Sequence, residues 1–492
     1  MRAHESMFFV CLYIMAANGD KDILLGYIRE GRHLSTGQRV RLTLLLCGPA
    51  ILAQLASVLL QFIDASMVGS LGAGPSASIG LVSTTTWILS GFCVAIAQGF
   101  SVQVAHRIGS GDFYGARQVL RQGLLVVTLF SLLLSLIALA IASPLPHWLG
   151  GEAGITADAS AYFRIYAAFL PMMLLGFFGS TMLMCSGEMK LPSLLNILMC
   201  TLDVIFNFLL IFPTRELTFL GLTLNVPGAG MGVRGAALGT GIAETVTALL
   251  MLYFLLRRNK DLAIVGEPGS FLPTRDCLDK AWSVTGPMWI QNLVMRGAYV
   301  ASTLIVAPLG AVSIAANSFA IIAESFCYMP GYGMGDAATT LVGQSLGAGR
   351  KNLAKSFSRI TLGLGVGMMV SLAVVMYFLS ARIMGLLSMD PKVVALGARC
   401  LRLEAFAEAG YAASIVAYAA CVGAGDTKVP TALNFISVWL VRICLALVLT
   451  PRFGLMGYWI AMFIELNVRG TLLVWRIRGE KWMKTKLTTQ EI

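Results

Sequence analysis

Long apolar segments separated by short polar breaks run through almost all of this 492-residue sequence. Only 12% of the residues are charged and 57% are hydrophobic, whereas soluble globular proteins carry roughly 25% charged residues. This number of charged residues is too small to cover the surface of a soluble protein. Part of the protein surface must therefore face lipid. A membrane-spanning helix needs about 20 mostly apolar residues, and the length leaves room for about twelve.

Charged residues and Gly/Pro clusters divide the apolar sequence into twelve predicted spanning helices. Their expected ranges are 42–64, 77–106, 119–142, 159–186, 191–213, 233–256, 281–307, 314–345, 357–381, 393–422, 428–449 and 454–476. The sequence therefore predicts an all-α integral membrane protein.

The breaks between these helices predict the domain organisation. The basic break 257–280 lies at the middle of the set and is expected to link an N-lobe, 39–256, to a C-lobe, 281–478. Residues 479–492 form the expected tail. Residues 1–38 are expected to be a poorly ordered extension, because their apolar stretch is too short to span and has no signal-peptide cleavage pattern.

Lys and Arg residues are distributed unevenly between the two sides of the predicted membrane. If the N-terminus is cytoplasmic, most of them fall on cytoplasmic segments. The opposite loops hold only Arg215, Arg234, Arg382, Lys392 and Arg452. This bias predicts an even number of spans with both termini in the cytoplasm, as in a bacterial inner membrane protein. The net charge of +11 then matches anionic lipid head groups, and no aromatic-interleaved basic stripe suggests a nucleic acid.

The two halves of the sequence repeat each other at one constant offset in residue number. Corresponding positions include Pro49 and Pro287, Gly109 and Gly347, Gly187 and Gly425, Lys190 and Lys428, Pro192 and Pro430, and Asn196 and Asn434. Each repeat has six helices, so both insert with the same orientation. We therefore expect two pseudo-symmetric six-helix bundles with a substrate cavity between them near mid-depth.

Three motifs at these repeated positions resemble a known family. They are Val58-x5-Asp64-x2-Met67-Val68-Gly69-x-Leu71-Gly72, Ala337-x3-Leu341-Val342-Gly343-Gln344-x-Leu346-Gly347 and Gly423-Ala424-Gly425-Asp426-Thr427-x2-Pro430. In order and spacing, over roughly residues 40–480, they resemble the multidrug and toxic compound extrusion (MATE) family, closest to its DinF-like branch.

The resemblance implies a V-shaped pair of bundles that exports organic, often cationic, small molecules in exchange for H⁺ or Na⁺, without a cofactor. We expect a monomer in contact with membrane lipid. In the DinF-like branch, two N-lobe aspartates carry the coupling cation, one at a fixed spacing after a proline on helix one, and one on helix five. Those positions match Asp64, which has the same spacing from Pro49, and Asp203, so the resemblance makes both candidate Na⁺ ligands.

Charged side chains inside the predicted helices point to the same function, because ionisable groups in a bilayer are costly and usually functional. Asp203 lies near mid-helix between Asn196 and Asn207, whose amides could share its proton or cation; a helix-packing hydrogen bond is the alternative. Asp64 lies near the outer end of its helix, where snorkelling to the interface is the alternative. A desolvated carboxyl group can hold a proton or ligate Na⁺, and the sequence leaves both open.

The second lobe carries further acidic candidates. Glu404 and Glu408 are four residues apart, which predicts that they share one helix face and hold either a proton or a basic partner, Arg296 or Arg442. Asp336 follows a Pro330-Gly331-x-Gly333-x-Gly335 stretch that should bend its helix. A structural ion-pair network is the alternative for Glu404 and Glu408.

Prolines and polar residues inside the helices complete the candidate set. Pro49, Pro287 and Pro330 each free backbone groups within a span and are predicted hinges. Polar candidates for the cavity wall are Gln54, Gln291, Asn292, Tyr299 and Asn317.

Other function classes fit the sequence less well. An ATP-driven pump would need a phosphate-binding loop, G-x-x-x-x-G-K-[S/T], which is absent. A membrane enzyme would need clustered histidines or paired acids at a membrane face, whereas the four histidines are scattered, and no CxxC or Cys/His cluster predicts a metal. A channel or receptor would not need coupled carboxylates in two lobes. A lipid-linked saccharide flippase, which shares the fold, remains the alternative transporter and would show more cationic residues in the cavity.

Overall fold

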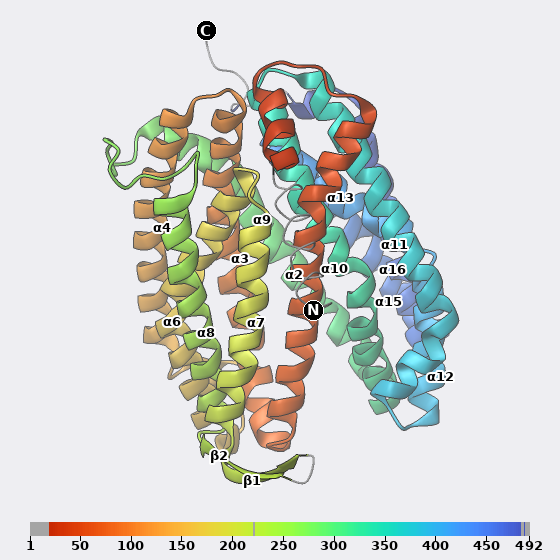
Figure 1. Ribbon diagram of the computed structural model, residues 1–492. Coiled ribbons are helices and arrows are strands. Elements are labelled where there is room, and N and C mark those ends of the chain that lie inside the picture. Colours follow the sequence, from red (N-terminus) through yellow and green to blue (C-terminus); the bar gives the residue numbers. More distant parts are fainter. Residues whose placement is uncertain (1–18, 220–221, 484–486, 488–492) are drawn as a thin grey trace.

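The computed structural model of the protein describes residues 19–219, 222–483 and 487. Figure 1 shows long helices running side by side between two ends. We call the end that holds residues 259–274 the linker end and the opposite end, which carries the only strands of the described residues, the hairpin end.

Twelve helical spans cross between these ends, in agreement with the predicted number. In the first half they are α2 (Thr36–Gly69), α3 (Ala73–Gly109), α4 (Phe113–Ile141), α6 (Ala153–Cys185), α7 (Lys190–Ile211) and α8 (Val233–Tyr253), which continues into η1 (Phe254–Arg258). In the second half they are α9 (Arg275–Val306) with η2 (Ala307–Leu309), α10 (Ala311–Gly347), α11 (Lys351–Leu387), α12 (Pro391–Glu404) with α13 (Glu408–Ala424), α14 (Lys428–Phe435) with η3 (Ile436–Ile443) and α15 (Cys444–Phe453), and α16 (Leu455–Arg478). Two short helices, α5 (Leu145–Trp148) and η4 (Lys481–Met483), lie outside the spans.

Ten of these helices are long and apolar enough to cross a membrane, and α12 with α13 forms an eleventh span that bends by 58°. The twelfth span, α16, is less apolar because it carries Glu465 and Arg469, which pair with each other. Paired charges lower the cost of placing this helix among the others.

Each half has its own hydrophobic core. Phe100, Leu174 and Phe178 lie in the core of the N-lobe. Cys400, Trp459 and Leu466 lie in a separate core of the C-lobe. Two cores of this kind are what two six-helix bundles require.

The lobes meet through repeat-related helices, because α2 packs on α10 as α9 packs on α3. At the linker end α3 and α10 cross each other closely. A Cβ on Gly109 would lie 2.1 Å from the carbonyl oxygen of Gln344, and a Cβ on Gly347 would lie 1.9 Å from that of His106. Gly109 and Gly347 are separated by the repeat offset, so the close contact is reciprocal and places the pseudo-twofold axis between α3 and α10.

A β-hairpin occupies the break between α7 and α8, where no regular structure was predicted. Strands β1 (Pro213–Phe219) and β2 (Leu222–Ala229) pair antiparallel, with Phe219 opposite Leu222. The Arg215 guanidinium lies over the rings of Phe208 and Phe212, at 4.3 and 4.1 Å from their centroids, and so holds the hairpin against the end of α7.

The expectation of a poorly ordered extension over residues 1–38 is wrong for residues 19–38. Residues 19–29 form a helix, and Leu24, Leu25, Ile28 and Leu34 are buried. The sequence analysis overlooked that four apolar side chains on a short segment can pack on the linker end of the bundle. Residues 1–18 lie outside the described residues.

Candidate functional site

Three predicted residues of the N-lobe come together in one buried cluster. The Asn207 side-chain amide on α7 donates to Asp64 of α2 at 3.1 Å and to Asp203, one turn earlier on α7, at 3.2 Å. Asp203 is 0% exposed and Asn207 is 1% exposed. The Asp64 and Asp203 carboxyl groups also contact each other. The structure therefore brings Asp64, Asp203 and Asn207 together as one site.

Helix α8 completes this site with residues that were not predicted to belong to it. Thr240 contacts the Asp203 carboxyl group, and Glu244 lies near enough to interact with it electrostatically. A Cβ on Gly239 would lie 2.2 Å from the side-chain oxygen of Asn207, so only glycine lets α8 pack against the amide. The repeat could not reveal these residues, because the two halves lose their constant offset before α8.

The chemistry of this cluster requires a positive charge. Two carboxylates in contact repel strongly when both are ionised, so a proton or a cation has to lie between them. Oδ1 of Asp203 and Oδ1 of Asn207 are buried acceptors without a hydrogen-bond partner. Across the described part of the chain, no three His, Cys, Asp or Glu side chains gather as a metal site. A bound Na⁺ would therefore use the amide oxygen of Asn207 beside the two aspartates, and the unpartnered oxygens fit that role.

The C-lobe contains an ion-paired group in η3 and α16. Glu465 accepts from Arg442 Nε at 2.9 Å and from Ser437 at 2.8 Å, and Arg469 lies 3.1 Å away. Ser437 and Arg442 both lie in η3, a π-helical turn whose wider spacing is often found at functional sites. Arg442 therefore pairs with Glu465, and the predicted alternative partner Arg296 lies instead over the Trp87 ring.

Beside this group, three further glutamates are buried among the helices. Glu324 of α10 is 5% exposed, and Glu404 and Glu408 are both 0% exposed. Neither carboxyl oxygen of Glu404 or Glu408 has a hydrogen-bond partner. Glu404 interacts electrostatically with Glu324, Glu408, Arg442 and Glu465. Four carboxyl groups thus face two guanidinium groups, and a buried surplus of negative charge has to be neutralised by protons or cations.

Glu404 and Glu408 do not share one continuous helix face, so that prediction is wrong. The helix breaks at residues 405–407, between α12 and α13, and turns by 58°. The Ala407 amide bonds the Glu404 carbonyl at 2.7 Å, a tight turn that replaces the regular helical bond. No proline or glycine marks this position, which explains why the sequence did not predict the break.

Asp336 lies between the lobes instead of joining the buried glutamates. It is half-buried on α10, and the side chain of Gln54 on α2 contacts it. Three residues earlier on α10, a Cβ on Gly333 would lie 2.7 Å from the Ile51 backbone nitrogen. Asp336 and Gln54 therefore meet beside a close contact between the two helices.

The remaining cavity candidates lie on two helices, with Gln291, Asn292 and Tyr299 on α9 and Asn317 on α10. Asn292 donates to the Gly91 carbonyl across the lobes at 3.1 Å, and Asn317 accepts from Trp459 within the C-lobe at 3.1 Å. Tyr299 contacts the Trp87 ring, with 5.9 Å between ring centroids. Gln291 has a buried side-chain oxygen without a partner. A substrate-lining role for these four residues and for Gln54 stays a prediction.

The three predicted hinge prolines lie inside continuous helices. Pro49 is in α2, Pro287 is in α9 and Pro330 is in α10. These helices form contacts between the lobes, and a hinge role for the three prolines stays a prediction.

Comparisons with known proteins add to this geometry. A family model described as MatE matches residues 49–209 and 287–448, corresponding stretches of the two repeats. "Probable multidrug resistance protein NorM" of Thermotoga maritima is 23% identical over 446 residues, which cover 90% of this chain and 93% of that protein. "Multidrug resistance protein MdtK" of Pectobacterium atrosepticum is 24% identical over 472 residues, covering 92% and 96%.

A solved structure has the same fold. A mutant of the Vibrio cholerae MATE transporter VcmN superimposes with a TM-score of 0.83 at 18% identity, covering 92% of this chain and 99% of that one. The predicted all-α fold of two six-helix bundles is thereby confirmed.

Proposed function

Because the chain belongs to the MatE family of multidrug efflux transporters, we propose that it is a secondary active antiporter. In this proposal it exports organic, often cationic, small molecules in exchange for H⁺ or Na⁺ by alternating access of the two lobes. It acts as a monomer in a bacterial inner membrane with both termini in the cytoplasm. The asymmetry of Lys and Arg residues supports this orientation. Closeness to the DinF-like branch stays a prediction.

The observation that carries the proposal is the shared hydrogen bond of Asn207 with Asp64 and Asp203. One amide between two carboxyl groups on different helices forms a site whose geometry depends on its charge. With a proton or Na⁺ bound, the carboxyl groups stay together. Once the cation leaves, their repulsion favours separation of α2 from α7.

Helix α2 connects this site to the other lobe. Asp64 lies toward its hairpin end, whereas Gln54 and Ile51 contact α10 of the C-lobe nearer the linker end. Pro49 lies just beyond these contacts and allows the helix to bend. A shift of Asp64 would therefore be carried along α2 to the contact between the lobes, which is the step that alternating access requires.

The buried glutamates of the C-lobe support a second place for protons or cations. Glu404 and Glu408 have no hydrogen-bond partner for any carboxyl oxygen, so each has to be protonated or cation-bound while buried. A surplus of acidic groups also favours cationic substrates over the anionic lipid carriers of a flippase. The cationic groups of this cluster, Arg442 and Arg469, already pair with Glu465.

The proposal is tested by export of a fluorescent organic cation, ethidium, from drug-susceptible cells that express the protein. Cells with the wild type should accumulate less dye than cells with an empty vector, and collapse of the ion gradients should abolish the difference. Asp203→Asn should behave as the empty vector. Equal accumulation in wild-type and empty-vector cells, with folded protein present in the membrane, would exclude the export of this substrate class.

A further inference from the structure

The N-terminal segment, residues 19–34, forms contacts that none of the transport steps above uses. It leads into α2 as the linker, residues 259–274, leads into α9. The repeat offset that relates Pro49 to Pro287 makes this segment the equivalent of the linker in the first half of the sequence. Both segments lie at the linker end of the molecule (Figure 1).

The linker is attached to the N-lobe. Arg121 of α4 donates to the carbonyls of Ile264 at 3.3 Å and Glu267 at 2.9 Å. Leu262 is 0% exposed and belongs to the hydrophobic core of the N-lobe. The linker therefore moves with this lobe.

The N-terminal segment is attached to the C-lobe. Arg350, between α10 and α11, donates to the Tyr27 carbonyl at 2.9 Å. Leu24, Leu25, Ile28 and Leu34 share one buried cluster with Leu341, Leu353 and Phe357 of the C-lobe. Met189 of the N-lobe belongs to the same cluster, so the segment covers the seam between the lobes.

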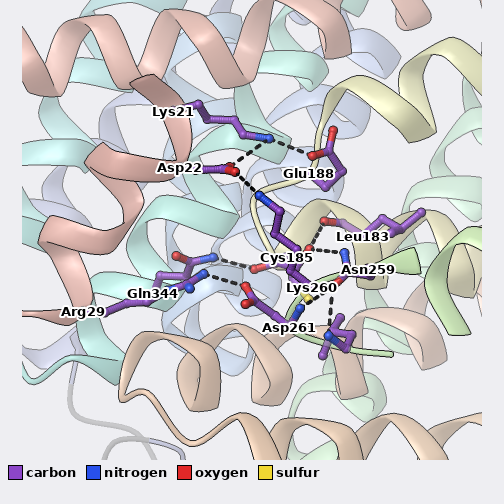
Figure 2. A network of polar contacts seen from close by, with 12 residues as sticks. Lys21, Asp22, Arg29, Leu183, Cys185, Glu188, Asn259, Lys260, Asp261 and Gln344 are labelled. Atoms are coloured by element: carbon purple, nitrogen blue, oxygen red, sulfur yellow. Dashed lines mark hydrogen bonds and ion pairs between the residues drawn. The ribbon is translucent and has the colours of Figure 1, made fainter. Parts of the chain in front are cut away.

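Ion pairs join the N-terminal segment to the linker and to the N-lobe. Arg29 lies 2.8 Å from Asp261, Lys260 lies 2.8 Å from Asp22, and Lys21 lies 2.8 Å from Glu188 (Figure 2). Lys21 is 7% exposed, and the Arg29 and Asp261 side chains are 19% and 21% exposed. The hydrogen bond to Asp22 raises the pKa of Lys260, which keeps this pair charged.

We propose that the N-terminal segment is an electrostatic latch that holds the lobes together at the linker end and releases when the transporter opens there. The chain of contacts runs from the C-lobe through Arg350 and Tyr27 to Arg29, across to Asp261, and through the linker into the N-lobe. Separation of the lobes at this end has to break it. The inference rests on the proposed alternating access. It adds that the N-terminal segment favours the state that is closed at the linker end.

The latch is tested by the accessibility of a cysteine placed in the seam. Thr340 of α10 is 2% exposed and bonds the Met184 carbonyl of the other lobe at 3.1 Å, so Thr340→Cys should react with a maleimide only when the lobes part. The rate of maleimide labelling is measured in detergent micelles, where both ends of the protein are accessible. The same protein without Thr340→Cys gives the labelling rate of the native cysteines. Neither substrate nor an ion gradient is needed, so the result is independent of whether the protein exports ethidium.

Charge reversal at the latch gives the decisive comparison. Arg29→Asp and Asp261→Arg should each raise the labelling rate about fivefold, the effect expected of losing one partly buried ion pair. The exchange Arg29→Asp/Asp261→Arg should return the rate to that of the unmodified latch. Arg275→Asp is the matched control, because the Arg275 side chain is 96% exposed and pairs with Asp279 one turn later on α9, and it should leave the rate unchanged.

Two outcomes would overturn the proposal. One is an unchanged rate in both single reversals with the protein folded and monodisperse. The other is a raised rate that the exchanged pair fails to restore, which would indicate local unfolding of the segment instead of release of a latch.

Discussion

His106 and Gln344 occupy equivalent positions in the two halves, and each bonds a backbone carbonyl of the opposite half. Nε2 of His106 lies 2.9 Å from the Gly423 carbonyl oxygen, and Nε2 of Gln344 donates to the Cys185 carbonyl at 2.8 Å. The repeat offset relates His106 to Gln344, and it also relates Cys185 to Gly423, whose carbonyls accept the bonds. This pair of bonds joins the lobes at the linker end around the pseudo-twofold axis.

The close crossing of α3 and α10 predicts that Gly109→Ala destabilises the protein. Its Cβ would lie 2.1 Å from a backbone oxygen, which cannot move aside as a flexible side chain can. A loss of about 1–3 kcal/mol is expected, measured by thermal or denaturant unfolding in detergent. The control is Gly363→Ala on α11, where a Cβ meets nothing within 4 Å. An equal effect of both substitutions would contradict the tight crossing.

The shared amide of the N-lobe site predicts that Asn207→Ala abolishes coupled transport without unfolding the protein. Removal of this donor leaves Asp64 and Asp203 without the amide that bonds both carboxyl groups. Transport should fall at least about tenfold, a cost of roughly 1.4 kcal/mol in the coupled step. Gly239→Ala should have the same effect, because its Cβ would displace the Asn207 side chain.

Thr201→Ala is the matched control for this prediction. Thr201 is exposed on the same helix and bonds only the Ile197 carbonyl, so transport should be retained. Normal gradient-driven transport in Asn207→Ala, measured in proteoliposomes, would remove the amide from the mechanism.

The Arg442–Glu465 pair predicts a large stability effect, because it is enclosed in the C-lobe. Arg442→Leu leaves the 0% exposed Glu465 carboxylate with Arg469 as its one remaining ion-pair partner among the described residues and should cost about 3–5 kcal/mol. Glu465→Gln added to Arg442→Leu should recover part of the loss. Lys280→Ala, which breaks the exposed Lys280–Asp276 pair, should cost less than about 1 kcal/mol. A loss as small for Arg442→Leu would show that its charge is compensated elsewhere.

The position of Pro49 predicts that Pro49→Ala slows export without lowering stability. Alanine restores a regular helical bond and stiffens α2 between the N-lobe site and the linker end. Pro171→Ala in α6, within the N-lobe, should leave export unchanged. If Pro49→Ala protein transports ethidium at the wild-type rate, α2 does not act as a bending element.

Much of this architecture was predictable. The lengths of the apolar segments indicate the spanning helices, and the constant offset between equivalent residues indicates the two bundles. The residues of the N-lobe site were predicted because buried acids and amides stand out within an apolar helix. Three features escaped prediction for physical reasons. The break after Glu404 has no proline or glycine, the docking of residues 19–34 depends on contacts with distant segments, and Gly239 matters only through the side chain that it faces.

The central claim is that Asp203 carries the cation that drives export. It is tested most directly by ethidium uptake into inside-out membrane vesicles under an imposed H⁺ gradient and, separately, an imposed Na⁺ gradient. The account predicts that one gradient drives uptake by the wild type, that Asp203→Asn abolishes it, and that Glu408→Gln reduces it. Gradient-driven uptake at the wild-type rate in Asp203→Asn would contradict the account.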